Sequence, residues 1–409
     1  MDITKIDGSV TAAKGFKAAG VPAGIKYTNR KDMAMIFSEA PATVAGMFTS
    51  NVVKAAPVKF DMEIVKSSPY VQAVIANSGI ANAATSEPGM DVCRKTAKHA
   101  ADVLGIPENA VLIGSTGVIG EQIPMDKITA GIDDLAKQLS DTRQAAADAE
   151  AAIMTTDTIP KEIAVTVSIG GKTVTIGGMS KGSGMIHPNM CTMLAYICTD
   201  CDISKEMLDL AAKTDIPDTF NMISVDGDTS TNDTYLILAN GLAKNPRIES
   251  KGEDFDTFMK ALHFVDEYLA RNMAKDGEGA TALFEVKVVG ADTKDNAKKL
   301  ARSVVSSSLC KAAIYGHDSN FGRFLCAMGY SGADFDPEKV SLDYESRAGS
   351  VRVFEDGCKK AYSEEEAGKI LSEDEVTVII DMHSGNASAT AWGCDLSYDY
   401  VKINADYRS

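Results

Sequence analysis

A threonine that precedes a short apolar run is the residue of this chain best placed for nucleophilic chemistry. Thr192 follows the glycine-containing segment 181–191 and opens onto residues 193–198, which carry no charge. Such a run is typical of a strand buried on both faces. Cutting the bond between Cys191 and Thr192 would place a new α-amine beside the threonine hydroxyl, where it can act as the base. We therefore expect self-cleavage at this bond and an N-terminal threonine nucleophile.

The residues upstream of Thr192 strengthen this interpretation, since threonine alone indicates only an ordinary strand residue. Gly182 and Gly184 allow close backbone approach, and Pro188 restricts the chain. A bond that cleaves itself needs an unusual backbone that brings its carbonyl near the hydroxyl. Lys181 is suited to lowering the pKa of the new amine or to binding a substrate carboxylate; a solvated turn lysine is the alternative.

A second loop has the pattern of an oxyanion hole. Residues 111–113 are apolar and are followed by Ser115, Thr116 and Gly117. A glycine turn after a strand presents backbone N–H groups outward, and the Thr116 hydroxyl adds a second donor. The alternative is a plain turn between a strand and a helix, which the sequence would favour if there were no nucleophile to serve.

Several motifs for metals and nucleotides are incomplete. His187 stands where the third glycine of a dinucleotide-binding loop is required, and the acidic loop that begins at Asp226 lacks the sixth-position glycine of a calcium loop. The pair Cys198 and Cys201 has no histidine nearby, which favours buried thiols over a redox or zinc site. We predict no metal site.

Hydrophobic periodicity predicts alternating strands and helices with hairpins. The expected strands are 71–76, 111–113, the hairpin 163–176, 235–238 and 376–380, and the C-terminal residues 401–409 are also patterned as a strand. The expected helices are 90–104, 255–273 and 296–313. A polar loop, 225–234, precedes the strand 235–238. This mixture predicts an α+β or layered α/β fold, with mixed sheets packed with helices.

The bulk composition limits the class of protein. The 409 residues are 45 % hydrophobic and 24 % charged, which is ordinary for a globular protein, and predict two domains or two intimately packed halves. The net charge of −16 argues against nucleic acid or a membrane surface as a general partner. No run is long enough to span a membrane and the first residues lack a signal-peptide core, so the eight cysteines predict a reduced, cytoplasmic protein.

The segment 181–194 closely resembles the self-cleavage segment of the ornithine acetyltransferases, the glutamate N-acetyltransferases of arginine biosynthesis. The likeness covers essentially the whole chain. The other segments that resemble the family's signatures follow in family order: 115–120, 154–161, 225–233, 276–281 and the tail from 391. The resemblance implies the family's fold, which is similar to that of N-terminal-nucleophile enzymes.

The resemblance also implies roles for individual residues. Thr192 would be the nucleophile and the first residue of a β chain, 192–409, that stays associated with an α chain, 1–191, in a heterotetramer of two of each. Thr116 and Gly117 would form the oxyanion hole. The residues implied to contact the amino-acid substrate are Thr155, Lys181, Thr192, Glu278, Asn404 and Ser409. Two positions depart from the family: Cys191 is often alanine there, and Ser409 is often threonine.

The implied activity is transfer of the acetyl group of N-acetyl-L-ornithine to L-glutamate through an acetyl-threonine intermediate, without a cofactor. Whether acetyl-CoA is also a donor depends on pocket shape and is left open. One alternative is a self-processed aminopeptidase or amidohydrolase, which would release acetate or amine without needing glutamate. The other is a non-enzymatic small-molecule binding protein, whose chain would stay uncut.

Overall fold

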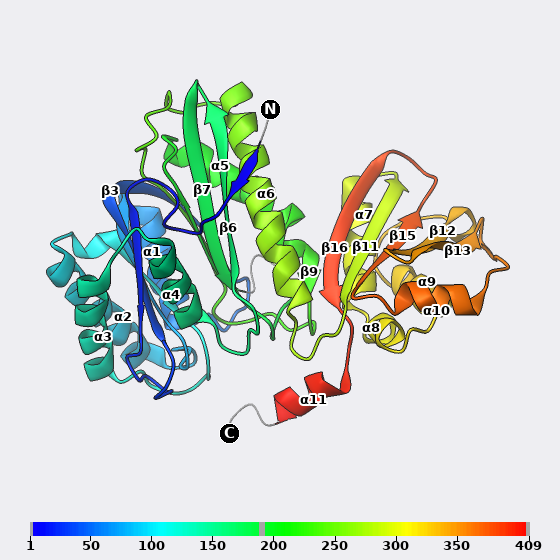
Figure 1. Cartoon of the computed structure of the whole chain (residues 1–409), viewed down its shortest axis with the longest axis horizontal. Helices are drawn as coiled ribbons and strands as arrows, with labels where there is room; N and C mark the ends of the chain where they lie inside the picture. The colour runs from blue at the N-terminus through cyan, green and yellow to red at the C-terminus, as the bar shows by residue number, and fades with distance from the viewer. Residues whose placement is uncertain (1–2, 188–192, 406–409) are drawn as a thin grey trace. The chain divides into compact units, whose positions relative to one another are not determined.

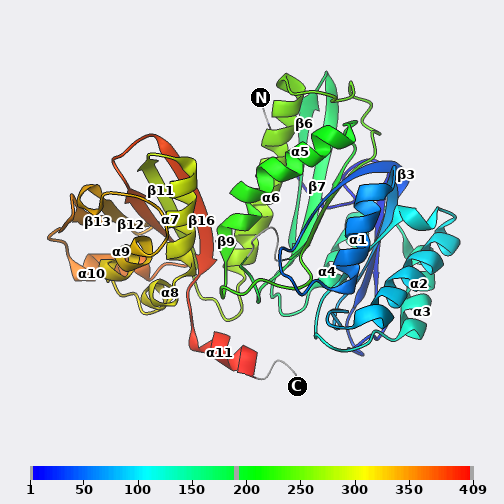
Figure 2. The same cartoon turned by 180° about the vertical axis from the view of Figure 1, so that it is seen from behind.

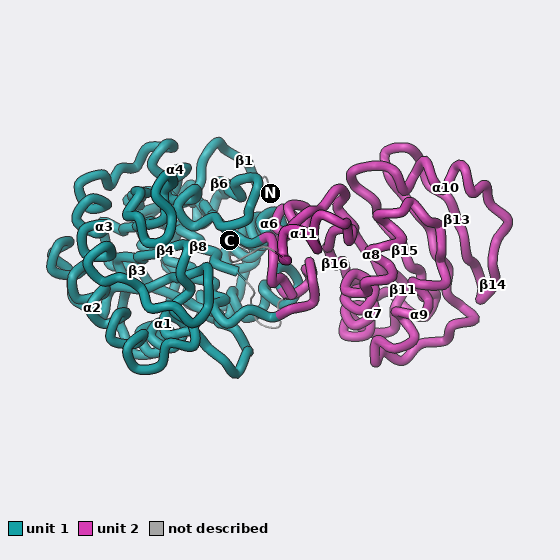
Figure 3. The backbone as a smooth tube through the Cα atoms, turned by 90° about the horizontal axis from the view of Figure 1, so that it is seen from below, with its two compact units in different colours: residues 1–182, 188–220, 229–269 teal, residues 183–187, 221–228, 270–409 magenta. Residues whose placement is uncertain are grey.

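The computed structural model describes residues 3–187 and 193–405. The chain forms two compact units, as its length predicted (Figure 3). Unit 1 comprises residues 1–182, 188–220 and 229–269, and unit 2 comprises residues 183–187, 221–228 and 270–409. These boundaries differ from the division into 1–191 and 192–409. That division is covalent, and it stays a prediction.

In the described part of unit 1, nine strands form one sheet (Figure 1). They are β1 (Thr4–Ile6), β2 (Phe16–Val21), β3 (Met33–Phe48), β4 (Val71–Asn77), β5 (Val111–Ser115), β6 (Lys161–Ile169), β7 (Lys172–Lys181), β8 (Leu194–Thr199) and β10 (Thr234–Ala239). Their order is β1-β6-β7-β8-β10-β3-β4-β5, with β2 also paired to β3. The predicted hairpin 163–176 is confirmed as β6 and β7, which are antiparallel.

The apolar run after Thr192 is the strand that the sequence predicted. Strand β8 is buried at all six positions and begins one residue later than expected. It lies between two neighbours, antiparallel to β7 and parallel to β10. Leu194 at its start is opposite Lys181 on β7 and opposite Thr234 on β10. Pairing on both sides fixes the backbone directly after the predicted nucleophile.

Helices cover the sheet of unit 1 (Figure 2). They are α1 (Ala56–Ser67), α2 (Ser86–Leu104), α3 (Met125–Gln138), α4 (Arg143–Ile153), α5 (Lys205–Asp215) and α6 (Glu253–Lys275), whose last residues belong to unit 2. Side chains from α1, α2 and α3 share one apolar cluster with β4 and β5. A second cluster joins α4 to β8 and contains Tyr196. The predicted helix 255–273 is confirmed, and the predicted helix 90–104 begins four residues earlier, at Ser86.

In the described part of unit 2, seven strands form a sheet in the order β14-β13-β12-β15-β11-β16-β9. They are β9 (Ile223–Ser224), β11 (Leu283–Ala291), β12 (Ser341–Ser346), β13 (Gly349–Glu355), β14 (Cys358–Lys359), β15 (Glu375–Asp381) and β16 (Ala387–Cys394). The helices are α7 (Lys294–Ser306), α8 (Ser308–Tyr315), α9 (Phe321–Gly329), α10 (Glu364–Leu371) and α11 (Tyr398–Ala405). Short 3₁₀ helices in the chain are Glu108–Ala110, Ile216–Asp218, Phe220–Met222 and Pro337–Lys339.

The single helix predicted over 296–313 is wrong, because the chain breaks there into α7 and α8. Ser307 has an extended backbone, with φ −72° and ψ 117°, and ends α7. Its hydroxyl accepts the Cys310 N–H at 3.3 Å and so caps the start of α8. Serine favours helix caps over helix interiors because its side chain competes for backbone hydrogen bonds.

The C-terminal strand predicted from residue 401 onward is also wrong. Residues 398–405 form α11, and residues 406–409 lie outside the described residues. The Ser397 hydroxyl accepts the Tyr400 N–H at 3.3 Å, which starts the helix. Tyr398 and Val401 are exposed, so no buried face selects an extended conformation. Mixed sheets packed with helices nevertheless match the predicted fold class.

In the part of the chain that the structure describes, no helix has the length and apolarity needed to cross a membrane. The thiols of Cys198 and Cys201 are free and buried, and burial raises the pKa of both. A raised pKa lowers the fraction of reactive thiolate, in agreement with the prediction of buried thiols.

Candidate active site

The predicted cleavage site lies in a segment whose placement is not described. Cys191 and Thr192, together with Ser409, fall outside the described residues. Met193, the residue after the predicted nucleophile, is buried, and its carbonyl accepts the Thr234 N–H at 2.7 Å.

The turn after β5 has the hydrogen-bond donors that an oxyanion hole requires. The Thr116 N–H is engaged, since it donates to the Asn77 carbonyl at 3.0 Å. The Gly117 N–H donates to none of the described residues, and the Thr116 hydroxyl is a second donor. The donors that this turn has available for the predicted oxyanion hole are thus the Thr116 side chain and the Gly117 backbone, rather than two consecutive backbone groups.

Only glycine fits at position 117. Its φ is +129°, in the region that residues with a side chain rarely adopt. A Cβ there would lie 2.2 Å from the carbonyl carbon of Gly79. The turn therefore needs glycine both for its conformation and for its close approach to the neighbouring backbone.

The polar loop before β10 holds this turn in place. The Asn232 side-chain amide donates to the Ser115 carbonyl at 2.8 Å and to the Ala81 carbonyl at 2.6 Å. The Ser115 hydroxyl is itself 2.7 Å from Asn77 Oδ1. Asn232 was not singled out from the sequence, although it lies within the family-like segment 225–233. Its partners are more than a hundred residues away in the chain, so spacing gives no signal for this contact.

Lys181 is buried. The alternative interpretation, a solvated lysine in a turn, is therefore wrong. Lys181 is 8 % exposed and ends β7 opposite Leu194. Its Nζ is 3.4 Å from Thr116 Oγ1. The structure therefore brings together the predicted substrate-binding lysine and the predicted oxyanion-hole threonine.

Asp157 connects Lys181 to Thr155 and was missed in the sequence. Its carboxylate accepts the Thr155 N–H at 3.0 Å and the Gly182 N–H at 2.7 Å. Lys161 Nζ is 2.7 Å from the same carboxylate, and both side chains are fully buried. Burial alone would raise the pKa of Asp157, but the charges of Lys181 and Lys161 and these hydrogen bonds outweigh it and hold the pKa well below its usual range.

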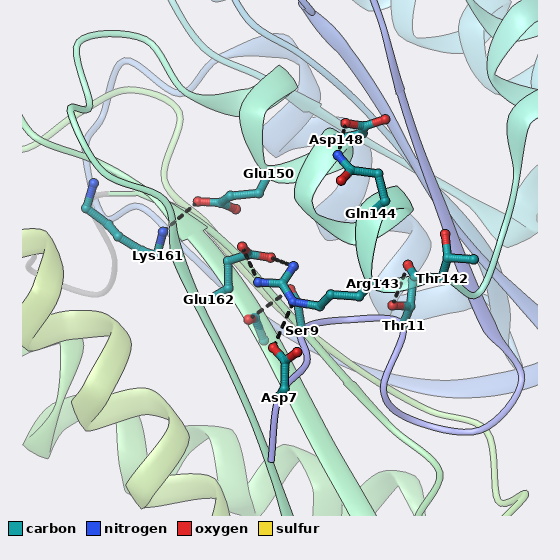
Figure 4. Close-up of polar contacts among 11 residues, drawn as sticks. Asp7, Ser9, Thr11, Thr142, Arg143, Gln144, Asp148, Glu150, Lys161 and Glu162 are labelled. Carbon is teal, nitrogen blue, oxygen red and sulfur yellow. Dashed lines mark hydrogen bonds and ion pairs between the residues drawn. The ribbon is translucent and has the colours of Figure 1, made fainter. Parts of the chain in front are cut away.

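Two further carboxylates fix α4 to the start of β6 (Figure 4). Glu150 Oε1 accepts the Lys161 N–H at 3.1 Å, and burial raises the pKa of Glu150 well above its usual range. Glu162 receives two hydrogen bonds from Arg143, at 2.8 and 2.9 Å. Since Thr155 follows α4 and Asp157 precedes β6, these contacts fix both ends of the segment that carries them.

Replacement of Asp157 by asparagine is expected to lower the free energy of unfolding by about 3–5 kcal/mol, because it removes the carboxylate that the buried Lys161 ammonium binds. Urea unfolding at pH 7 would measure the loss. The double variant Asp157→Asn with Lys161→Met removes the buried charge as well, so it should recover part of the stability. Equal stability of Asp157→Asn and the unmodified protein would contradict the role of this ion pair.

In unit 2, two predicted substrate-binding residues lie together. The Asn404 side-chain amide donates to Glu278 Oε2 at 2.8 Å, and the Glu278 N–H donates to the Ser183 carbonyl at 2.9 Å. A Cβ on Gly184 would lie 2.3 Å from the carboxyl carbon of Glu278. Gly184 is thus needed for the close approach of the Glu278 carboxylate.

Asp226 orders the rest of the segment within unit 2. Its carboxylate accepts the N–H groups of Met185 and Ile186 at 2.6 and 2.8 Å. The Tyr400 hydroxyl of α11 donates to the same carboxylate at 3.3 Å, and burial and the charge of Asp226 raise the pKa of Tyr400. The acidic loop thus binds backbone and a tyrosine hydroxyl.

Comparison with known proteins shows to which family the chain belongs. The profile of the ArgJ family matches residues 17–409. The "Arginine biosynthesis bifunctional protein ArgJ" of Caldanaerobacter subterraneus subsp. tengcongensis is 50 % identical over 99 % of each chain. The protein of the same name from Thermotoga neapolitana is also 50 % identical, over 97 % of this chain and 99 % of its own. A solved chain of ornithine acetyltransferase from Mycobacterium tuberculosis, complexed with ornithine, is 38 % identical; the match covers 46 % of this chain and 99 % of that one, with a TM-score of 0.43. The chain belongs to the ArgJ family.

Proposed function

We propose that this protein is a glutamate N-acetyltransferase of arginine biosynthesis, which moves the acetyl group of N-acetyl-L-ornithine to L-glutamate. The names of its relatives support the pathway and the transfer. The observation that carries the proposal is the turn at Thr116 and Gly117, where the Thr116 hydroxyl and the Gly117 N–H donate to no described acceptor. The Thr116 hydroxyl oxygen itself accepts a hydrogen bond from Lys181 Nζ at 3.4 Å.

The first step is self-cleavage. Thr192 Oγ attacks the Cys191 carbonyl carbon, and the peptide bond shifts from nitrogen to oxygen to give an ester. Water then hydrolyses the ester, which leaves a carboxylate on Cys191 and a free amine on Thr192. Cysteine in place of alanine before the cut leaves the attacked carbonyl unchanged, so cleavage proceeds here as well.

In the transfer, Thr192 Oγ attacks the acetyl carbonyl while the Thr192 α-amine takes the hydroxyl proton. The Thr116 hydroxyl and the Gly117 N–H stabilise the oxyanion of the tetrahedral intermediate. The C–N bond then breaks, and ornithine leaves after its nitrogen receives the proton from the α-ammonium. Glutamate enters next, and its amine takes the acetyl group from the threonine ester by the reverse sequence of steps.

Charged residues provide recognition of the amino acids. Lys181 binds a substrate carboxylate, which replaces part of the hydration that the buried ammonium has lost. Glu278 binds a substrate ammonium, and Thr155, Asn404 and Ser409 contribute polar contacts. Asp157 keeps the backbone of Thr155 and the end of β7 in register with each other.

Acetyl-CoA is proposed as a second acetyl donor, because the curated relatives are named bifunctional. The same acetyl-threonine intermediate serves both donors, so no additional catalytic group is required. The reaction needs no resident cofactor, since one threonine supplies both nucleophile and base. We place the enzyme in the cytoplasm, with substrates that are small and soluble.

The two chains are expected to remain associated after cleavage, because they share one sheet. Strand β7 of residues 1–191 is paired with β8 of residues 192–409, and β3 is paired with β10. Size-exclusion chromatography without denaturant should give one species that contains both chains, and denaturing electrophoresis should separate them. We propose a heterotetramer of two α and two β chains. Separation of the chains without denaturant would contradict the shared sheet.

One set of assays tests the function. The purified protein is incubated with N-acetyl-L-ornithine, with and without L-glutamate, and then with acetyl-CoA and L-glutamate. Formation of ornithine and N-acetylglutamate that depends on glutamate supports the proposal. Release of acetate at the same rate without glutamate would indicate the amidohydrolase, and an intact, inactive chain would indicate a binding protein.

A further inference from the structure

Two buried side chains of unit 1 meet at strand β5, which leads into the turn at Thr116 and Gly117 (the oxyanion turn). They are Asp61 of α1 and Tyr196 of β8, and both are fully buried. Neither the Tyr196 hydroxyl nor the Oδ2 atom of Asp61 makes a hydrogen bond with a described residue. Buried polar atoms in this condition are costly. The steps of acetyl transfer use neither residue, so their burial needs another explanation.

Asp61 holds the open edge of β5. This strand is the last in the order of its sheet, and among the described strands it pairs only with β4. Its other edge therefore has backbone N–H groups that no described strand binds. Asp61 Oδ1 accepts one of them, the Ile113 N–H, at 2.8 Å. Ile113 lies three residues before Thr116, so the Asp61 carboxyl fixes β5 just before the oxyanion turn.

Tyr196 contacts β5 at the next residue, Gly114. Strands β10, β3 and β4 separate β8 from β5 in the order of the sheet, but the apolar cluster that contains Tyr196 also contains Leu112 of β5. A Cβ added to Gly114 would lie 2.0 Å from the Tyr196 hydroxyl oxygen. The tyrosine side chain therefore spans the core from β8 to β5, and glycine at position 114 makes room for its end.

The Asp61 carboxyl and the Tyr196 hydroxyl are close enough to influence each other. Burial raises the pKa of Tyr196, and the nearby charge of Asp61 raises it further. Burial also raises the pKa of Asp61 well above its usual range, against the smaller lowering effect of the hydrogen bond from Ile113. Both shifts favour the neutral form of the group. Strand β5 is thus held at two consecutive residues by groups that avoid a buried charge.

We propose that Tyr196 and Asp61 are positioning residues for acetyl transfer, which set the place of the oxyanion turn by holding β5 at Ile113 and Gly114. This role rests on the proposed function. An oxyanion donor acts over a distance of about 2.7–3.1 Å, so its effect depends closely on its placement. A displacement of about 1 Å can cost about a hundredfold in rate. Since Ser115 joins Gly114 to the turn, a shift of β5 moves both donors of the turn.

The first test places a methyl group between β5 and Tyr196. Gly114→Ala brings a Cβ against the tyrosine hydroxyl and should displace β5. We therefore expect kcat for acetyl transfer, measured per cleaved chain, to fall about tenfold or more, with little change in KM for either amino acid.

A second substitution should reverse this loss. In the double variant Gly114→Ala with Tyr196→Phe the hydroxyl is absent, and the nearest remaining atoms, the ring Cζ and the Cβ of Ala76, lie 3.3 and 3.4 Å from the new Cβ. The double variant should recover most of kcat. An unchanged kcat in Gly114→Ala, or an equally low kcat in the double variant, would overturn the role of Tyr196.

The second test removes the hydrogen bond at the edge of β5. Asp61→Leu leaves the Ile113 N–H without its acceptor, so kcat should fall about tenfold while KM changes little. Asp61→Asn keeps an oxygen acceptor in the same place and should retain kcat within a few-fold. In a Thr116→Ala background the loss caused by Asp61→Leu should be smaller, because the turn then has one donor fewer to displace.

Asp200→Leu is the matched control. Asp200 is also buried in unit 1, and its carboxylate accepts the N–H of Thr175 on β7 at 2.8 Å, but it follows the far end of β8. Urea unfolding should show a loss of stability in both leucine variants, and only Asp61→Leu should lose kcat. Equal kcat in the two leucine variants, or equal loss of kcat in Asp61→Leu and Asp61→Asn, would overturn the role of Asp61. Absence of acetyl transfer in the unmodified, cleaved protein would overturn the proposed function and both roles with it.

Discussion

Replacement of Thr192 by alanine is expected to leave a single polypeptide of 43.3 kDa that transfers no acetyl group. The hydroxyl is the attacking group in cleavage and in transfer, so its loss stops both. Loss of a nucleophile costs about 10⁴-fold or more in turnover, which places the variant at background activity. Intact-mass spectrometry measures the first effect, and the assay with N-acetyl-L-ornithine and L-glutamate measures the second.

Thr192→Ser is the matched control for this prediction. Serine keeps the hydroxyl and, after cleavage, the α-amine, so this variant should still be cut and should retain measurable transfer. Met193 and β8 are unchanged in both variants, so both should show the same secondary structure by circular dichroism. A Thr192→Ala protein that is cut and active would remove Thr192 from both steps, and the assignment of the nucleophile would have to be abandoned.

The local elements of this fold could be predicted from the sequence where one periodicity is clear. Residues 193–198 are all apolar, and a run of that length bounded by polar residues fits a strand buried on both sides, as β8 is. Residues 398–401 fit two periodicities, because Tyr398 and Val401 are three apart and Tyr398 and Tyr400 are two apart. Burial normally decides between them, and here the side chains are exposed. The helix α11 therefore was not predicted.

The site residues were predicted because they lie in recognisable motifs. The residues that hold them in place, such as Asp157 and Asn232, were not predicted. Asp157 accepts the N–H of Gly182, which is 25 residues away, and Asn232 binds the carbonyl of Ser115, which is 117 residues away. These contacts join loops whose proximity depends on the order of strands in the sheet. Strand order is not encoded in the spacing of one segment, so such contacts become visible only once the sheet is assembled.

The burial of Asp233 likewise depends on strand order, which the spacing of residues along the chain does not reveal. An aspartate at the end of a polar loop reads as a solvated residue, because loop carboxylates are mostly exposed. Its burial results from the parallel pairing of β10 with β8, which places it beside Met193. The burial of Asp233, which is 1 % exposed, therefore becomes visible only once the register of two strands that are 40 residues apart is known.

Replacement of Thr116 by alanine is expected to lower kcat for acetyl transfer about a hundredfold, with little change in KM for either amino acid. The variant loses the hydroxyl donor, while the Gly117 N–H remains. The Thr116 N–H still donates to the Asn77 carbonyl, so the turn keeps its shape. A donor that acts mainly on the developing oxyanion affects the transition state more than the bound substrate, and its loss appears in kcat. Steady-state assays of the cleaved protein measure both constants.

Thr116→Ser separates the loss of the hydroxyl from a change in packing. Serine keeps the donor 3.4 Å from Lys181 Nζ and should retain kcat within a few-fold of the unmodified protein. If Thr116→Ala instead raises KM and leaves kcat unchanged, the hydroxyl acts in substrate binding through Lys181 and the oxyanion is stabilised elsewhere. Equal loss of kcat in both variants would indicate that the methyl group shapes the turn. The proposed mechanism requires kcat to fall in Thr116→Ala and not in Thr116→Ser, because it assigns the catalytic effect to the hydrogen bond that the hydroxyl donates.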